Sequence, residues 1–163
     1  MDKASTCCFI GHRKLPKEKI EQIIIRLDQE VENLINMGVT DFISGGALGF
    51  DQIAASLIIA KKEMGRKIRL IFALPCKNQD EFWSDEQKRL YHNIIAEADE
   101  VIYVSEEYSN GCMKKRNRYM VERSAYCICA HLHPFSGTDQ TVKYARKKGL
   151  KILNVAEQRM HFL

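Results

Sequence analysis

Proline and tryptophan are scarce in this 163-residue sequence, which has three prolines and one tryptophan, and long apolar runs are missing altogether. No stretch approaches the roughly 20 apolar residues that cross a bilayer, so we expect no membrane partner. The opening residues MDKASTCCFIGHR offer too short an apolar stretch for a signal peptide, and we therefore expect a cytoplasmic protein. Because proline-rich linkers, low-complexity tracts and internal repeats are also missing, one domain over residues 1–163 is the expected organisation.

Strong charge of either sign is missing as well. The chain has 25 basic and 21 acidic residues, a formal net charge of +4, while 45% hydrophobic and 28% charged residues are globular values. This mild positive balance suits a local anionic ligand better than a long nucleic-acid track.

Six cysteines occur in a chain without an export signal, so free thiols are expected rather than a disulfide framework. Cys127, Cys129, His131 and His133 occupy alternate positions in CICAHLH, which invites a metal interpretation. On a strand, however, same-face neighbours lie about 6.6 Å apart, whereas zinc needs each donor within roughly 2.3 Å. The segment is therefore predicted to be a buried strand, and no metal site is expected.

Short β-rich runs alternate with helical patterns along the whole chain. Strands are predicted at residues 6–10, 40–44, 67–74, 99–105, 125–132 and 150–155, and helices at residues 17–37, 50–64, 84–98, 113–124 and 139–148. This alternation predicts a Rossmann-like α/β fold, a three-layer sandwich with a mostly parallel central sheet. Ligands of such sheets bind beyond the carboxyl ends of the strands.

The segment SGGALGFD carries the clearest ligand signal at that edge. Its candidate ligand-binding residues are Ser44, Gly45, Gly46, Ala47, Gly49 and Asp51. Glycines let backbone approach a ligand, and free N–H groups at a helix start form an anion site, so a phosphate cradle is predicted; a tight turn is the alternative. The segment lacks both the Lys-Ser/Thr of a Walker loop and the G-x-G-x-x-G spacing. Asp51 is predicted either to cap the helix or to bind a ribose hydroxyl.

Three further loops carry residues suited to an anion. Gly11, His12 and Arg13 follow the first strand, where the arginine can bind phosphate or carboxylate and the histidine can donate a hydrogen bond or move a proton. The alternative is an ordinary surface loop. The other two candidate sets open helices: Lys114, Lys115, Arg116, Asn117 and Arg118 in one, and Ser136, Gly137 and Thr138 in the other.

The cations near residue 114 are unfavourable at a helix N-terminus unless an anion lies nearby, so they favour a ligand over a solvated basic face. The hydroxyls of Ser136 and Thr138 suit a phosphate, although simple capping would also explain them. Four such loops at one edge of one sheet make a ligand site the better explanation.

Five segments, FIGHR, SGGALGFDQIAA, ALPCKNQDEFW, CMKKRNRYMVERS and SGTDQTVKYARKKG, together resemble the YpsA-like branch of the SLOG superfamily, which also holds DprA/Smf and the lysine-decarboxylase-like LOG proteins. The resemblance implies a Rossmann-like fold that binds a nucleotide or a derivative such as ADP-ribose or an NAD-like compound, as a sensor or regulatory module. It names no cofactor, and a homo-oligomer is compatible with it. In the third segment, Trp83 is predicted either to stack on a base or to anchor a helix.

The LOG enzymes cleave the base from a nucleoside monophosphate with a catalytic glutamate, and Thr141 stands where that glutamate would fall. Without this carboxylate, binding outranks an N-glycosidase or phosphoribohydrolase activity, and no catalytic residue is named; Asp139 and Glu122 are the nearby carboxylates. Single-stranded nucleic acid, by analogy with DprA, is the less favoured partner, because one lysine-arginine cluster is a small basic surface.

Overall fold

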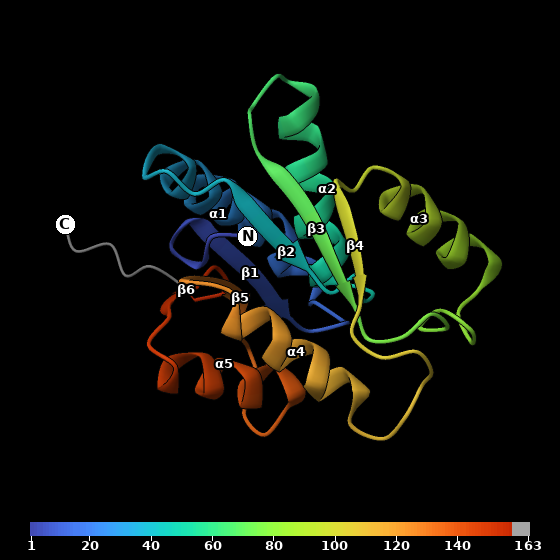
Figure 1. The fold of residues 1–163 in the computed structure, drawn as a ribbon. Coiled ribbons are helices and arrows are strands. Elements are labelled where there is room, and N and C mark those ends of the chain that lie inside the picture. The colour runs from blue at the N-terminus through green and yellow to red at the C-terminus, as the bar shows by residue number, and fades with distance from the viewer. Residues whose placement is uncertain (158–163) are drawn as a thin grey trace.

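Six parallel strands form one sheet in the centre of this computed structural model, which describes residues 1–157 (Figure 1). The strands are β1 (Thr6–Gly11), β2 (Asp41–Ser44), β3 (Arg69–Leu74), β4 (Glu100–Tyr103), β5 (Tyr126–Ala130) and β6 (Lys151–Asn154). The helices are α1 (Lys17–Asn36), α2 (Phe50–Glu63), α3 (Asp85–Ala96), α4 (Cys112–Glu122) and α5 (Gly137–Lys147), and a short 3-10 helix covers Lys3–Ser5. The strand order β4-β3-β2-β1-β5-β6 places β1 in the interior of the sheet.

Local sequence explains why these segments adopt these structures. In α1, Ile23, Leu27, Val31 and Leu34 recur at three- and four-residue spacing and are all buried, as an amphipathic helix requires. Helix α3 begins with a capping box, in which Ser84 and Gln87 satisfy each other's backbone N–H groups. The first five residues of β1, 6–10, are all buried, which is typical of a parallel strand covered by helices on both faces.

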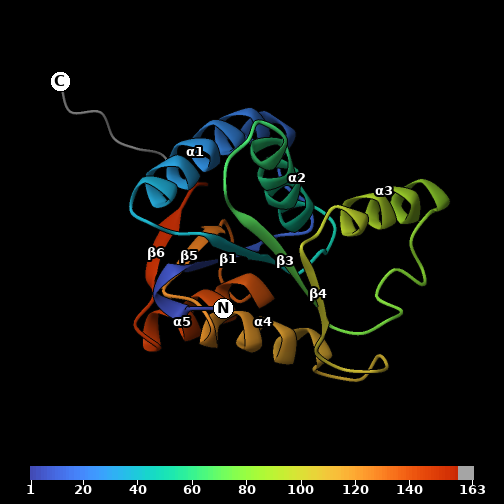
Figure 2. The same cartoon turned by 45° about the horizontal axis from the view of Figure 1, so that its top comes forward.

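The helices divide between the two faces of the sheet. Helices α1, α2 and α3 lie on one face and α4 and α5 on the other (Figure 2). One apolar core packs Phe9, Phe42 and Phe72 against the first group of helices, and a second packs Ile43 and Ile71 against the second group. The fold is thus the three-layer, Rossmann-like sandwich that the alternation predicted.

The boundaries differ little from the predicted ones. Each predicted helix and strand begins and ends within two residues of the observed one, and the 3-10 helix at the start was not predicted. All six cysteines are buried and free, as expected. None of the helices among residues 1–157 has the length and apolarity to cross a membrane.

The direction of the crossovers creates a crevice beside β1. The chain moves outward from β1 through β2 and β3 to β4, and it then returns to the other side of β1 for β5 and β6. The loops after β1 and β5 therefore lead to helices on opposite faces of the sheet. A crevice between such loops is the usual ligand position in open α/β sheets.

Candidate ligand-binding site

A cavity of about 290 Å³ lies at this crevice and is called the polar pocket below. Its walls come from the end of β1 and the loop after it, the β2–α2 loop, the first turn of α2, the first two turns of α4 and the start of α5. The residues are Ile10, Gly11, His12, Arg13, Ala47, Asp51, Met113, Arg116, Asn117, Ser136, Gly137 and Thr138. Residues as far apart in the chain as Ile10 and Thr138 therefore meet at one edge of the sheet.

Arg116 lies in the wall of the polar pocket and is only 4% exposed. Its Nη1 donates to the carbonyl oxygen of Gly45 at 2.5 Å, and its Nε donates to Oδ1 of Asn117 at 2.9 Å. Burial lowers the pKa of Arg116, while the nearby Asp51 carboxylate opposes that change. The hydrogen bond to Gly45 thus fixes the guanidinium in place, and the Asp51 carboxylate compensates part of its charge.

Asp51 is the buried carboxylate of the pocket, at 6% exposure. Its Oδ2 accepts a hydrogen bond from the Ala47 N–H at 3.3 Å, and its main-chain oxygen accepts one from Ser44 Oγ at 2.9 Å. Burial raises the pKa of Asp51 to about 6, and Arg116, the Ala47 N–H and Arg13 oppose the rise. Asp51, in the first turn of α2, therefore stabilises the loop between β2 and α2. It is not the N-cap of α2, which is Gly49 and has no side-chain hydrogen bond.

Protein atoms occupy the space that side chains at the three loop glycines would need. A Cβ at Gly45 would overlap the Arg116 guanidinium, and one at Gly49 would overlap the backbone carbonyl of Arg13. Gly46 has a φ of +70°, and a Cβ there would lie 3.0 Å from Leu74 in the core. Close packing of the loop explains the missing side chains, and a backbone phosphate cradle at these glycines stays a prediction.

His12 joins the loops after β1 and β5. Its Nε2 accepts a hydrogen bond from the Leu132 N–H at 3.0 Å, and its ring centroid lies 4.9 Å from that of His133. Burial, followed by His133 and His131, lowers the pKa of His12. The imidazole is therefore neutral at pH 7, with Nε2 occupied and the proton on Nδ1.

The loop before α5 is held by its own hydrogen bonds. Ser136 is the N-cap and accepts from the Asp139 N–H at 3.0 Å, while Asp139 in turn pairs with His131 at 2.8 Å and with Lys143 at 3.0 Å. The Lys143 hydrogen bond is the main cause that lowers the pKa of Asp139. These hydrogen bonds hold Gly137 and Thr138 in the lining of the polar pocket, where the first N–H groups of the helix have no intrahelical acceptor.

A second, more open cavity of about 620 Å³ runs between α4 and α5 and is called the basic groove. It includes Lys114, Arg118 and Lys143, and the Arg118 guanidinium lies 4.8 Å from the centre of the Tyr144 ring. Thr141 also lines this groove and is held by Asn117 and by the carbonyl of Gly137. Of the cations at the start of α4, Arg116 therefore lines the polar pocket, Lys114 and Arg118 line the basic groove, and Lys115 lines neither.

The structure brings most of the predicted site residues together. Gly11, His12, Arg13, Ala47, Asp51, Arg116, Asn117, Ser136, Gly137 and Thr138 line the polar pocket. Ser44, Gly45, Gly46, Gly49 and Arg118 lie outside its lining. Ile10 and Met113 were missed; the signal for Met113 was its three- and four-residue spacing from Arg116 and Asn117, which places all three on one helix face.

Trp83 and the cysteine-histidine segment, residues 127–133, lie outside the lining of the polar pocket. The Trp83 ring meets Tyr91 of α3 edge-on with centroids 5.0 Å apart and packs against the first core, as a helix anchor would. Cys127 and Cys129 are fully buried in β5. Within residues 1–157, no group of three or more His, Cys, Asp or Glu side chains is arranged to hold a metal ion.

Comparison with known sequences gives one family and several relatives. The sequence model of the YspA SLOG family (YpsA) matches residues 10–159. An uncharacterised SPbeta prophage-derived protein, YoqJ, of Bacillus subtilis is 37% identical over 65% of this chain and 69% of its own length. A UPF0398 protein of Halalkalibacterium halodurans is 29% identical over 60% of this chain and 52% of its own.

Two solved structures share the fold. DNA processing protein A (DprA) from Streptococcus pneumoniae superimposes with a TM-score of 0.66 at 20% identity, over 92% of this chain and 50% of that one. The Helicobacter pylori protein of the same name, described for its single-stranded DNA binding mode, gives a TM-score of 0.65 at 19% identity, over 92% of this chain and 64% of that one. This chain thus spans half to two thirds of these longer proteins, and the likeness shows the fold alone.

Proposed function

The chain belongs to the YspA SLOG family, and from that premise we propose that its polar pocket binds the phosphate group of a nucleotide-derived ligand such as ADP-ribose or an NAD-like compound. The protein then acts as a sensor or regulatory module whose occupancy is passed to a partner. The pocket is the binding site, and catalysis is not part of this proposal.

The observation that carries the proposal is the convergence of positive groups on one pocket. The N-termini of α2 and α5, the exposed Arg13 and the buried Arg116 all meet there, and Asp51 is the acidic side chain of the lining. Because His12 is neutral, two guanidinium charges face at most one carboxylate, and the helix N-termini add to the positive potential. A phosphate group is the ligand chemistry that such a pocket favours.

The polar side chains suggest how the rest of the ligand is held. Thr138 supplies a hydroxyl beside the N-terminus of α5, whereas the Ser136 hydroxyl already donates to the His133 carbonyl. Asp51 supplies a carboxylate that can accept hydrogen bonds from ribose hydroxyls. Arg116 is already bonded to Gly45, so in this arrangement it contributes charge and rigidity, whereas the exposed Arg13 is the guanidinium able to contact the phosphate directly.

A thermal-shift screen tests the proposal. Wild-type protein is heated with millimolar AMP, ADP-ribose, NAD or inorganic phosphate, and a ligand that binds only the folded state raises the melting temperature by mass action. We expect at least one nucleotide to raise it, and by more than inorganic phosphate does. A melting temperature unchanged by all three nucleotides would contradict the proposal.

The second candidate function is N-glycosidase activity, and the observation that supports it is the raised pKa of Asp51 in the polar pocket. A carboxylate with a pKa of about 6 in a ligand pocket has the character of a general acid or base. The carboxylates considered from sequence are less suitable, because Glu122 accepts from the Tyr144 hydroxyl at the surface and Asp139 is paired with His131 and Lys143. Release of free adenine from AMP, lost in Asp51→Asn, would establish this activity.

Binding of single-stranded nucleic acid is the third and least favoured candidate. One neighbour in fold is described for that activity, and the basic groove offers Lys114, Arg118 and Lys143. A groove of this size covers few nucleotides, whereas strand binding without sequence preference uses a longer positive track with stacking aromatics. Fluorescence anisotropy with a labelled oligonucleotide tests it, and we expect no binding at physiological salt.

A further inference from the structure

A third cavity, of about 420 Å³, lies next to the polar pocket and is called the aromatic cavity. Two of its lining residues, Arg13 and Met113, also line the polar pocket, so the two cavities share a wall. Its other walls come from the β3–α3 loop and the β4–α4 loop, which supply Gln79, Phe82, Trp83 and Tyr108. A ligand held by its phosphate in the polar pocket can therefore extend past Arg13 into aromatic surroundings.

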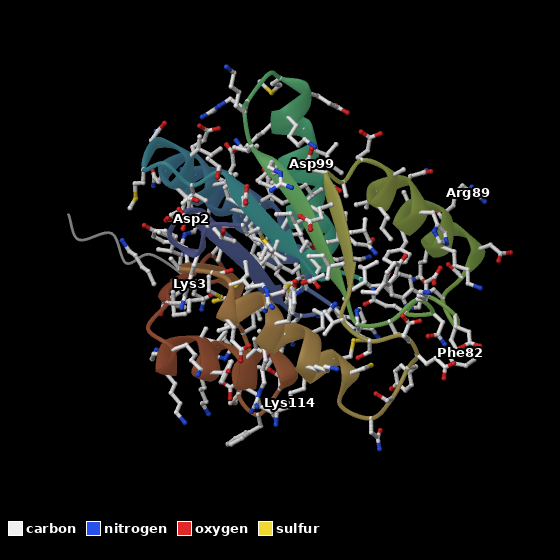
Figure 3. The ribbon with its side chains drawn as sticks, viewed as in Figure 1. Asp2, Lys3, Phe82, Arg89, Asp99 and Lys114 are labelled. Atoms are coloured by element: carbon white, nitrogen blue, oxygen red, sulfur yellow. The ribbon has the colours of Figure 1, made fainter. Side chains whose placement is uncertain are left out.

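Two of the three aromatic side chains of this cavity are exposed to solvent. Phe82 is 93% exposed and Tyr108 is 62% exposed, and Figure 3 shows Phe82 projecting from the loop that precedes α3. Trp83 is partly buried, and its ring forms a T-shaped contact with that of Tyr91. Exposed aromatic groups around a cavity mark a place where an apolar or ring-shaped partner is bound.

Gln79 gives an independent indication of a bound group. Its side chain is 8% exposed, and its Nε2 donates to the Tyr91 hydroxyl at 2.9 Å and to the Gly45 carbonyl at 3.4 Å. Its Oε1 is buried and has no hydrogen-bond donor among the described residues. A buried acceptor without a donor is costly. The oxygen is closed to solvent in this arrangement, so the Gln79 side chain, which lines the cavity, would have to turn toward it for an N–H group of a ligand to satisfy the oxygen.

We propose that the aromatic cavity is the base subsite of the same nucleotide and that it selects an amino-substituted base such as adenine. The inference rests on the proposed function, because the phosphate in the polar pocket fixes the position of the base. The ring lies among Phe82, Trp83 and Tyr108, and its exocyclic amino group donates to Gln79 Oε1 once that side chain has turned toward the cavity. A base with a carbonyl oxygen at that position places two acceptors face to face and binds more weakly.

The sole tryptophan of the chain makes this testable by fluorescence. Trp83 emission reports directly on the cavity, and AMP, IMP and ribose 5-phosphate serve as probes that differ only in the base. We expect AMP to quench the emission and to bind about tenfold more tightly than IMP. Ribose 5-phosphate should displace AMP in competition, and it should leave the emission unchanged.

Two substitutions separate the subsite from the phosphate site. Phe82→Ala and Tyr108→Ala remove exposed side chains, so folding should be unaffected, and each should weaken AMP binding by at least threefold while leaving ribose 5-phosphate binding unchanged. Phe135→Ala is the matched control, because Phe135 is 90% exposed but lies in the β5–α5 loop, outside the aromatic cavity.

The outcomes distinguish this inference from the proposed function. Equal affinities for AMP and ribose 5-phosphate, with no quenching and no effect of Tyr108→Ala, would overturn the base subsite and leave the phosphate site standing. Equal affinities for AMP and IMP would overturn the selection by Gln79. Failure of the wild type to bind either AMP or ribose 5-phosphate would overturn the inference and the proposed function together.

Discussion

The guanidinium of Arg116 lies directly against Gly45 and donates to its carbonyl oxygen at 2.5 Å, across a sequence separation of 71 residues. This contact joins the first turns of α4 to the glycine loop after β2. It explains why Gly45 lacks a side chain and how a cation near a helix N-terminus is accommodated. The shape of the polar pocket depends on this packing.

Substitution of Gly45 by alanine should therefore destabilise the fold. The added Cβ overlaps the Arg116 guanidinium, and forcing the two apart in a packed site should lower the free energy of unfolding by about 2 kcal/mol. Gly137→Ala is the matched control, since a Cβ there meets open space and should change stability by less than about 0.5 kcal/mol. Urea unfolding measures both. Equal stability of the two variants would show that Arg116 does not constrain the loop.

The stability of the protein should depend on the ionisation of Asp51. Its pKa is raised from 3.8 to about 6 by burial, so the folded state holds a proton between these values that the unfolded chain has released. The contribution of Asp51 to stability is therefore fully present below about pH 4 and is lost as the pH rises through 6, a change of about 3 kcal/mol.

Asp51→Asn provides the measurement for this pH dependence. Because asparagine does not titrate, the free energy of unfolding of the variant relative to wild type should rise by about 2 to 3 kcal/mol between pH 4 and pH 7. Parallel stability curves for the two proteins over this range would mean that Asp51 is ionised with an ordinary pKa.

Arg13 should matter for ligand affinity and little for folding. It is exposed and lines both the polar pocket and the aromatic cavity, so Arg13→Gln should change the free energy of unfolding by less than about 0.5 kcal/mol. Loss of one charge-assisted hydrogen bond should weaken ADP-ribose binding by about 2 kcal/mol, and the salt dependence of binding should become flatter. Lys14→Gln, at the neighbouring exposed position, controls for general charge. If the two substitutions weaken ADP-ribose binding equally, Arg13 acts only through the general positive charge of the surface, and the prediction of a direct contact is wrong.

Purified protein should release no free base from AMP above the uncatalysed rate. Thr141 is bonded to Asn117 and to the Gly137 carbonyl, and a threonine hydroxyl cannot stabilise a cationic sugar. His12 Nε2 is occupied by the Leu132 N–H, which removes that nitrogen as a base. Chromatography of a time course decides the point, and turnover that disappears in Asp51→Asn would move the protein to the hydrolases.

The order of the elements could be predicted from sequence because local patterns decide it. The spacing of Ile23, Leu27 and Val31 defines α1, and the unbroken apolar residues of β1 define a strand covered on both faces. The family resemblance was likewise carried by contiguous segments. The four loops were expected at the carboxyl edge of a parallel sheet, and the structure places all of them there.

The partners within the site could not be predicted, because they depend on contacts between distant segments. Helical spacing separates Arg116 from Arg118, but only the fold shows that the first lies against Gly45 and the second against Tyr144. The raised pKa of Asp51 depends on its burial between α2 and the loops, which no local pattern encodes. The unpartnered Gln79 oxygen became visible only once Tyr91 and Gly45 were known to hold the amide nitrogen.

Isothermal titration of ADP-ribose into the wild type and into Gly137→Val tests the central proposal most directly. Gly137 lines the pocket and a Cβ added there meets open space, so valine should narrow the pocket without disturbing the fold. Lys147→Val, at the exposed far end of α5, controls for the substitution itself. The account predicts one-to-one binding by the wild type and by Lys147→Val, and at least tenfold weaker binding by Gly137→Val. Wild-type affinity in Gly137→Val, or no binding by the wild type, would contradict it.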